Sequence, residues 1–550
     1  MPSMFRRKTK KGNEEKPLMK NIEQTDGEQV SECSSQQSGV PDLIAPDVKA
    51  CNKRVLHTLR KILSDQSTPE DFDAAVEVLK TLSNLNNNYS QDWLCEYLLE
   101  IDQFVERHFP TLPAEGPRGS QLEQIQDFLK SAQSMIYDGV LRLTPALKDA
   151  GLLDHLKDSY SRHIFTNLDL LLNRDLSVKE IFCLLLWGKD LFFSSDSQHF
   201  FRVYDPLLLT GWFQRATEKL LPKLQDDISK TLQNILNYDE ELGHNGDSMD
   251  EETVIRVHLD VTQCLNAVIQ GSKQFSHTLM YTTQTLCLKE LHQFVQEYVY
   301  VEKERLEKQQ HLKKNSVHLF RLISTCRQLR FFAPELNPDM NNGDDLSNIT
   351  HMLKEMEDHV LSIVQEMMKH VAQAFLRHYF KKGGEQIQGL TEAIKKQCAS
   401  LPQTDEGKEI QEIFVNVSYD CVSHVYLDCL MKSKFRRLER RWGNVEGRIR
   451  KDVLSFTELN GTDDQKNHLL RKLSEVLLCS DVEALKITCC DLFKNFPQDS
   501  ERYVPGLLRW KGMLSERQMR EVLDLSREFG LELKPRRGTC QPLKGLCCCL

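Results

Sequence analysis

The residues best suited to chemistry in this chain are three adjacent thiols in its last six residues, GLCCCL. Cys547 is followed by two residues and a final Leu550, the arrangement in which a cysteine is prenylated and a terminal leucine favours a geranylgeranyl group. Cys548 and Cys549 stand where aliphatic residues are typical. S-acylation of the cluster, with Cys540 as a further site, is an alternative, and a thiol-rich tail without modification is a third interpretation.

Basic side chains form a second chemical feature near the beginning of the chain. The residues concerned are Arg6, Arg7, Lys8, Lys10 and Lys11. A polybasic segment gains about 1 kcal/mol per Lys or Arg beside an anionic lipid leaflet, so this pattern predicts reversible membrane contact. The alternatives are a tail that only keeps the protein in solution and a sequence that merely resembles a nuclear-localisation signal. One lipid chain binds a membrane only marginally, whereas a lipid chain with basic patches anchors stably.

A second basic run lies late in the chain and carries interleaved apolar residues. Its basic members are Lys432, Lys434, Arg436, Arg437, Arg440 and Arg441. Phe435, Leu438 and Trp442 separate them. Two interpretations remain open, a solvated helix face whose aromatic residues pack inward and a contact for anionic lipid or an acidic protein. The net charge of −9 argues against nucleic acid, because binding of nucleic acid usually needs a basic domain.

Motifs for catalysis or metal binding are missing from the sequence. It contains no phosphate-binding loop, dinucleotide fingerprint, zinc-protease helix or nucleophile elbow. Cys421, His424 and Cys429 would share one helix face, but no fourth ligand accompanies them, so core packing is favoured over a metal site. The adjacent Cys489 and Cys490 are interpreted in the same way. The sequence therefore predicts no enzyme, no cofactor and no metal.

Long helices must position these residues. The chain has 550 residues with only 25 Gly and 18 Pro, and such sparse punctuation favours uninterrupted helices. Apolar residues recur every three to four positions at 55–63, at about 280–313 and, most clearly, over 350–381, where one stripe continues for about nine turns. Loops are expected at 112–119, at the acidic stretch 238–252, and at 337–345, 401–407 and 460–464.

These patterns predict an all-α fold, an elongated rod of stacked antiparallel helical bundles. The predicted segments are a disordered basic and polar region at 1–48, an N-terminal helical region at 49–111, a helical bundle at 120–237, a bundle with long helices at 253–400, a C-terminal helical bundle at 407–530 and a basic, cysteine-rich tail at 531–550. Residues 1–48 are expected to be disordered because they carry too few apolar side chains to offset the conformational entropy lost on folding.

The cysteine usage bears on the cellular compartment. Seventeen cysteines are spread along the chain without paired spacings, and no secretory leader precedes them. The longest apolar clusters fall far short of the roughly 18 residues that a membrane span needs. We therefore expect reduced thiols in a cytoplasmic protein that is peripheral at the plasma membrane.

Two late stretches resemble the exocyst complex component 3 family. They are FRRLERRWGNVEGRIRKDV at 435–453 and YVPGLLRWKGMLSERQMREVL at 503–523. The family's Leu-Leu-x-x-basic-Gly pattern corresponds to 507–512, where Lys511 and Gly512 complete it. Met513 stands where the family would have an acidic residue. The match is concentrated in about the last hundred residues, and neither motif is catalytic.

The resemblance implies a rod of the tethering-complex type without enzymatic activity. It implies a role in vesicle tethering and exocytosis at the plasma membrane, with SNARE proteins and exocyst subunits as partners. One branch of the family acts with a Ral-type small GTPase in actin-based protrusions, and there a basic N-terminal segment contacts phosphoinositides. Arg6, Arg7, Lys8, Lys10 and Lys11 match that segment by position and charge. The alternative function is a membrane-remodelling adaptor outside the assembled exocyst.

Overall fold

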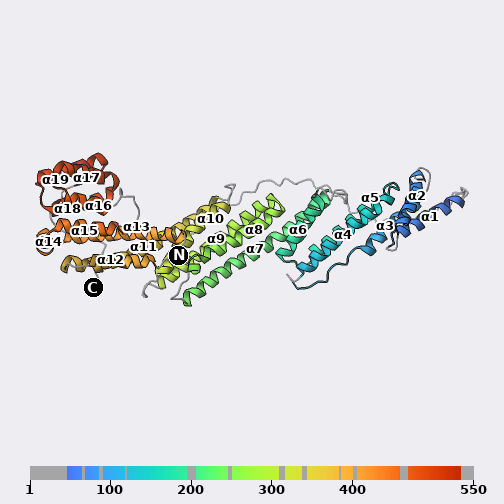
Figure 1. Ribbon diagram of the computed structural model, residues 1–550, viewed down its shortest axis with the longest axis horizontal. Coiled ribbons are helices and arrows are strands. Elements are labelled where there is room, and N and C mark those ends of the chain that lie inside the picture. Colours follow the sequence, from blue (N-terminus) through green and yellow to red (C-terminus); the bar gives the residue numbers. More distant parts are fainter. Residues whose placement is uncertain are drawn as a thin grey trace, which may run out of the picture. The chain divides into compact units, whose positions relative to one another are not determined.

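The structure is a computed structural model, and its ribbon is shown in Figure 1. It describes residues 46–64, 68–85, 91–117, 121–194, 206–245, 251–308, 316–336, 343–382, 386–399, 405–458 and 469–533. These residues form the α-helices α1 to α19 and two short 3₁₀ helices, and none of them lies in a strand. The predicted all-α class is confirmed for this part of the chain.

The chain divides into two compact units, Met1–Glu100 and Ile101–Leu550. The first unit contains α1 (Pro46–Ile62), α2 (Pro69–Leu85) and the first half of α3 (Gln91–His108). Its α1 and α2 pack against each other. The buried side chains that hold it together are Val55, Leu59, Ile62, Leu63, Ala75, Leu79 and Tyr97. The finer predicted segments remain a prediction.

The second unit continues with helices that pack onto close neighbours in the sequence. Its first helices are α4 (Leu122–Leu147), α5 (Leu153–Leu172) and α6 (Val178–Phe193). A capping box starts α6, in which the Ser177 hydroxyl accepts from the Glu180 backbone and the Glu180 carboxylate accepts from the Ser177 backbone. The same carboxylate accepts the backbone N–H of Gln121 at 3.1 Å, so one buried side chain joins two helix starts.

Five long helices form the middle of the second unit. They are α7 (Pro206–Asn245), α8 (Glu251–Phe275), α9 (His277–Lys308), α10 (Ser316–Phe332) and α11 (Gly343–Lys382), with the short η3 (Ala333–Leu336) before α11. The helix predicted over 350–381 is confirmed within α11. Its buried stripe includes Leu353, Val360 and Leu376, whereas Val371 is 36% exposed although the sequence pattern assigned it to the core.

The acidic stretch 238–252 is not a loop throughout, and that prediction was wrong for its first part. Helix α7 continues to Asn245, and Asp239 within it is buried. Acidic residues normally favour solvent, which is why the sequence indicated a loop. The helix continues because a buried arginine compensates the charge of Asp239.

Short helices make up the C-terminal part of the second unit. They are α12 (Gln386–Ala399), α13 (Asp405–Lys432), α14 (Phe435–Trp442), α15 (Val445–Thr457), α16 (Leu469–Leu478), α17 (Val482–Asn495), α18 (Pro497–Lys511), α19 (Glu516–Asp524) and η4 (Leu525–Phe529). Figure 1 shows α15 to α19 gathered beside the last turns of α13. The cluster starts where α13 packs against α16 and α18.

One continuous apolar core joins the middle and C-terminal parts, from Leu224 to Leu533. Along it, α8 packs against α10, α9 packs against α11, and α11 then packs against α13. Successive helices thus bury each other's apolar faces, as the prediction of stacked bundles requires. None of the described helices is both long and apolar enough to cross a membrane.

Candidate functional site

Two of the predicted sites lie outside the described residues. The basic segment Arg6, Arg7, Lys8, Lys10 and Lys11 is one of them, and the tail that carries Cys540 and Cys547 is the other. Of the region 1–48 that was predicted to be disordered, only the last three residues are described, and they belong to α1. The late basic run is described completely.

The late basic run spans the end of one helix and the whole of the next. Lys432 ends α13, Lys434 precedes α14, and the four arginines lie within α14. Helix α14 stops at Gly443, whose positive φ of 72° glycine adopts without strain. All six basic side chains of the run are exposed.

The apolar residues of the run fasten α14 to the core. Leu438 is 1% exposed. The ring of Trp442 lies 5.2 Å from that of Tyr379 and 5.5 Å from that of Phe380, both at the end of α11. Phe435 contacts the edge of Trp510 on α18 at 5.3 Å. The predicted inward packing of the aromatic side chains is therefore confirmed.

Helical geometry places the arginines on the opposite side of α14. At about 100° per residue, Arg436, Arg440 and Arg437 occupy an arc of about 100° centred opposite Leu438 and Trp442. Arg441 lies at the margin, and its guanidinium donates to the backbone carbonyl of Phe380. We call the arc formed by Arg436, Arg437 and Arg440 the arginine face of α14.

The cysteine and histidine group on α13 makes contacts typical of packed side chains. His424 hydrogen-bonds the Tyr503 hydroxyl at 3.1 Å, and the two rings stack at 5.7 Å. The Cys421 thiol donates to the backbone carbonyl of Gln365. Burial raises the pKa of Cys421 to about 11 and also raises the pKa of Cys429, whereas a metal ligand must be a thiolate.

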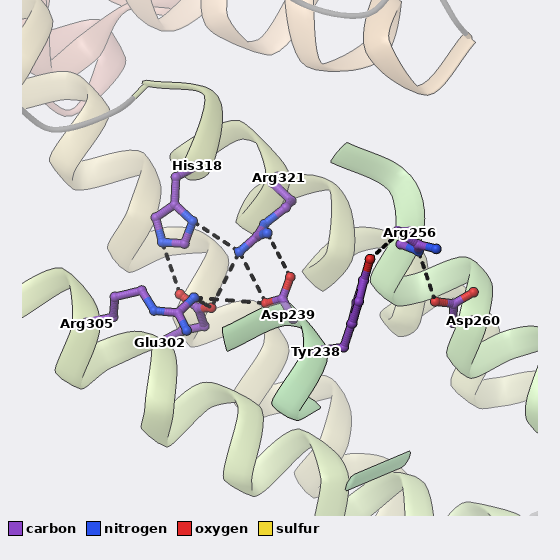
Figure 2. A network of polar contacts seen from close by, with 8 residues as sticks. All are labelled: Tyr238, Asp239, Arg256, Asp260, Glu302, Arg305, His318 and Arg321. Carbon is purple, nitrogen blue, oxygen red and sulfur yellow. Dashed lines mark hydrogen bonds and ion pairs between the residues drawn. The ribbon is translucent and has the colours of Figure 1, made fainter. Parts of the chain in front are cut away.

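A buried cluster of charged groups, which sequence analysis missed, joins three helices of the middle part (Figure 2). Asp239 comes from α7, Glu302 and Arg305 from α9, and His318 and Arg321 from α10. Arg321 is fully buried and approaches both carboxylate oxygens of Asp239, at 2.7 and 3.2 Å. Arg305 approaches Glu302 at 2.7 Å, and His318 Nε2 lies 3.1 Å from the same carboxylate.

Charge balance explains how this buried cluster is tolerated. Two carboxylates face two guanidinium groups, and the His318 ring lies between them, with Nδ1 at 3.3 Å from Arg321 and Nε2 at 3.1 Å from Glu302. Burial raises the pKa of Asp239. Burial also acts to raise the pKa of Glu302, but the hydrogen bond and charge of His318, with Arg305 and Arg321, lower it overall.

The buried cluster joins helices and is largely closed to solvent, with Arg305, at 13%, its most exposed member. Glu302 and Arg321 are at most 1% exposed, so no substrate reaches them. Sequence spacing offers a weak signal, because Glu302 and Arg305, and also His318 and Arg321, are three residues apart on their helices. That spacing is ordinary for surface ion pairs, so only the packing of α7, α9 and α10 reveals the cluster.

Comparison with known proteins decides which family the chain resembles. No family profile matches it. Tumor necrosis factor alpha-induced protein 2 of Mus musculus is 21% identical over 480 residues, which cover 81% of this chain and 67% of that protein. The resemblance to the exocyst complex component 3 family is confirmed.

A solved structure shows the same fold. The crystal structure of M-Sec superposes with a TM-score of 0.60 at 17% identity and covers 87% of this chain and 88% of that chain. The similarity in fold therefore extends along most of the chain. The comparisons show a sequence similarity to tumor necrosis factor alpha-induced protein 2 and a helical fold shared with M-Sec.

Proposed function

We propose that this chain is a non-enzymatic vesicle-tethering protein that acts in exocytosis at the plasma membrane and binds exocyst subunits and SNARE proteins. The observation that carries the proposal is the similarity to the exocyst-type relative over 81% of the chain. A tether needs an extended array of packed helices with partner sites along its surface, and a catalytic cleft is not required for that role.

The charged groups of the structure support a scaffold. The cluster around Arg321 fixes α7, α9 and α10 to one another, and its arginine Arg321 and both its carboxylates are buried. The exposed charges of α14, in contrast, face outward on a helix that is fastened to the core. Rigid elements with outward charges are suited to holding partners in place.

Membrane attachment is part of the proposal. The segment with Arg6, Arg7, Lys8, Lys10 and Lys11 binds anionic lipid, and the thiols of Cys540 and Cys547 carry lipid groups. Mass spectrometry of the C-terminal peptides from eukaryotic cells tests the second statement. A prenyl or acyl mass on either cysteine supports it, and unmodified thiols on both contradict it.

Affinity capture from cells tests the partners. The tagged full chain is expressed at native level, and captured exocyst subunits and SNARE proteins are quantified against the tag alone. Enrichment of both groups of proteins is the expected result. Capture of neither group, from an extract in which the exocyst itself remains assembled, overturns the proposed function.

The family resemblance supports one alternative, a membrane-remodelling adaptor that acts with a Ral-type small GTPase in actin-based protrusions, outside the assembled exocyst. Capture by the GTPase loaded with a non-hydrolysable GTP analogue, compared with the GDP-loaded form, distinguishes the two. Nucleotide-dependent capture without exocyst subunits favours the adaptor, and exocyst capture independent of nucleotide favours the tether.

A further inference from the structure

Helix α14 breaks the local rules of helix stability. Its first turn contains no acidic residue and instead carries Arg436 and Arg437, although the positive end of the helix dipole favours acidic groups there. Arg436 and Arg440 are four residues apart, as are Arg437 and Arg441, and like charges at this spacing repel each other. Such local conflicts in natural sequences are expected at functional sites.

The arginine face also differs from other arginine-bearing helices of the described residues in its ion pairing. Within the described residues, Arg436, Arg437 and Arg440 form no ion pair. Helix α19 and the adjoining η4 show the opposite arrangement, because Arg517 pairs with Glu521, Arg520 with Glu516, and Arg527 with Asp524. Three exposed lysines add positive charge near this helix. Lys432 and Lys434 directly precede α14, and Lys381 follows Phe380, whose backbone carbonyl Arg441 contacts.

The apolar side of α14 is already used by the core. Leu438 is buried, Trp442 packs on α11, and Phe435 packs on Trp510. A protein interface usually centres on desolvated anchors, which are aromatic side chains and arginines, and the arginine face has exposed arginines without an aromatic or apolar side chain of α14 beside them. A layer of lipid headgroups needs no such anchor, because its attraction is electrostatic and is spread over a plane.

We propose that the arginine face of α14 binds the phosphate groups of an anionic membrane. A guanidinium fork matches two phosphate oxygens, which suits arginine better than lysine for this contact. Three guanidinium groups on a convex helix can meet a flat array of phosphates together. This inference rests on the proposed function only in placing the chain at a membrane, and it does not depend on the exocyst partners.

Vesicle co-sedimentation with the purified full chain tests the proposal. The vesicles are phosphatidylcholine alone and phosphatidylcholine with phosphatidylinositol bisphosphate. The variant is R436E/R437E/R440E, and the matched control, R517E/R520E/R527E, makes the same charge change on paired arginines. We expect binding of the first variant to the anionic vesicles to fall at least about tenfold at low salt, and the control to bind like the wild type.

The N-terminal basic segment is removed as a source of binding in a second set of proteins. Charges at Arg6, Arg7, Lys8, Lys10 and Lys11 are reversed in every member, and the fall caused by the α14 variant is expected to persist. If the glutamate variant has a lowered thermal midpoint, R436Q/R437Q/R440Q replaces it, since glutamine is helix-compatible and neutral. Capture of exocyst subunits by the same proteins is measured in parallel.

Several results would overturn the proposal. Anionic vesicles that bind the folded α14 variant as tightly as the wild type exclude a lipid contact at this face. An equal loss in the α19 control shows a general charge effect. Unchanged vesicle binding with lost capture of exocyst subunits, SNARE proteins or a Ral-type GTPase makes the arginine face a protein site. If exocyst capture fails in the wild type itself, the proposed function fails, while the lipid result still stands.

Discussion

At the scale of single residues, Asp452 on α15 shows how one buried carboxylate joins three helices. Its Oδ2 accepts the Tyr379 hydroxyl from α11 at 2.6 Å and the Tyr426 hydroxyl from α13 at 2.9 Å. Burial raises the pKa of Asp452 to about 6, although both hydrogen bonds favour the carboxylate. The folded state therefore takes up this proton at a higher pH than the unfolded state.

This shift predicts a pH dependence of stability. Because the pKa is higher in the folded state, the contribution of Asp452 falls as pH rises from about 4 to about 6. Asp452→Asn keeps an acceptor for both tyrosines and removes the titration. As pH rises from 4.5 to 7.5, the free energy of unfolding of the wild type should fall by about 2 kcal/mol more than that of this variant. Urea unfolding of both proteins across that pH range measures the difference in their free energies of unfolding. A difference that does not change with pH contradicts the prediction.

Arg321 provides a second prediction at this scale. Arg321→Met leaves Asp239 buried without its main partner, and breaking a buried ion pair in this way costs about 3–5 kcal/mol. Adding Asp239→Asn should recover part of the loss, because the unpaired charge is then removed. Denaturant unfolding of the two variants and the wild type measures these changes in the free energy of unfolding. A loss below about 1 kcal/mol for Arg321→Met would show that the cluster does not stabilise the fold.

At the scale of helices, the sequence predicts most reliably where one side of a helix is uniformly apolar. The stripe from Leu353 to Tyr379 predicted α11 because it repeats for about nine turns. The end of α7 was missed because its acidic residues resemble a solvated loop, and their compensation by Arg321 is a tertiary property. The packing of the Cys421 and His424 group could be anticipated, whereas its contacts with Gln365 and Tyr503 could not.

Helix α14 carries a prediction that separates function from stability. Arg436→Glu places an acidic residue in the first turn and on the same helix face as Arg440, four residues later, so it should raise the free energy of unfolding by about 0.3–1 kcal/mol. The matched change Arg520→Glu on α19 breaks an exposed pair with Glu516 and should leave stability unchanged or slightly lower. Thermal and urea unfolding measure both. A clear loss of stability in Arg436→Glu would make the arginine structural.

At the scale of the whole molecule, composition and two C-terminal motifs were enough to predict the helical class and the family resemblance. Few glycines and prolines indicate long helices, and the motifs at 435–453 and 503–523 lie on α14, α15, α18 and α19. The division at Glu100 could not be predicted, since helical patterning runs through it without a break. The predicted lipid-binding and lipidation sites lie outside the described residues.

The proposed function requires this chain to hold vesicles at the plasma membrane. Imaging by total internal reflection microscopy, in cells depleted of the chain and then supplied with it again, measures the density of docked secretory vesicles directly. We expect docking to fall on depletion, to return with the wild-type chain, and to return less completely with R436E/R437E/R440E. Docking that stays unchanged after complete depletion would contradict a tethering function.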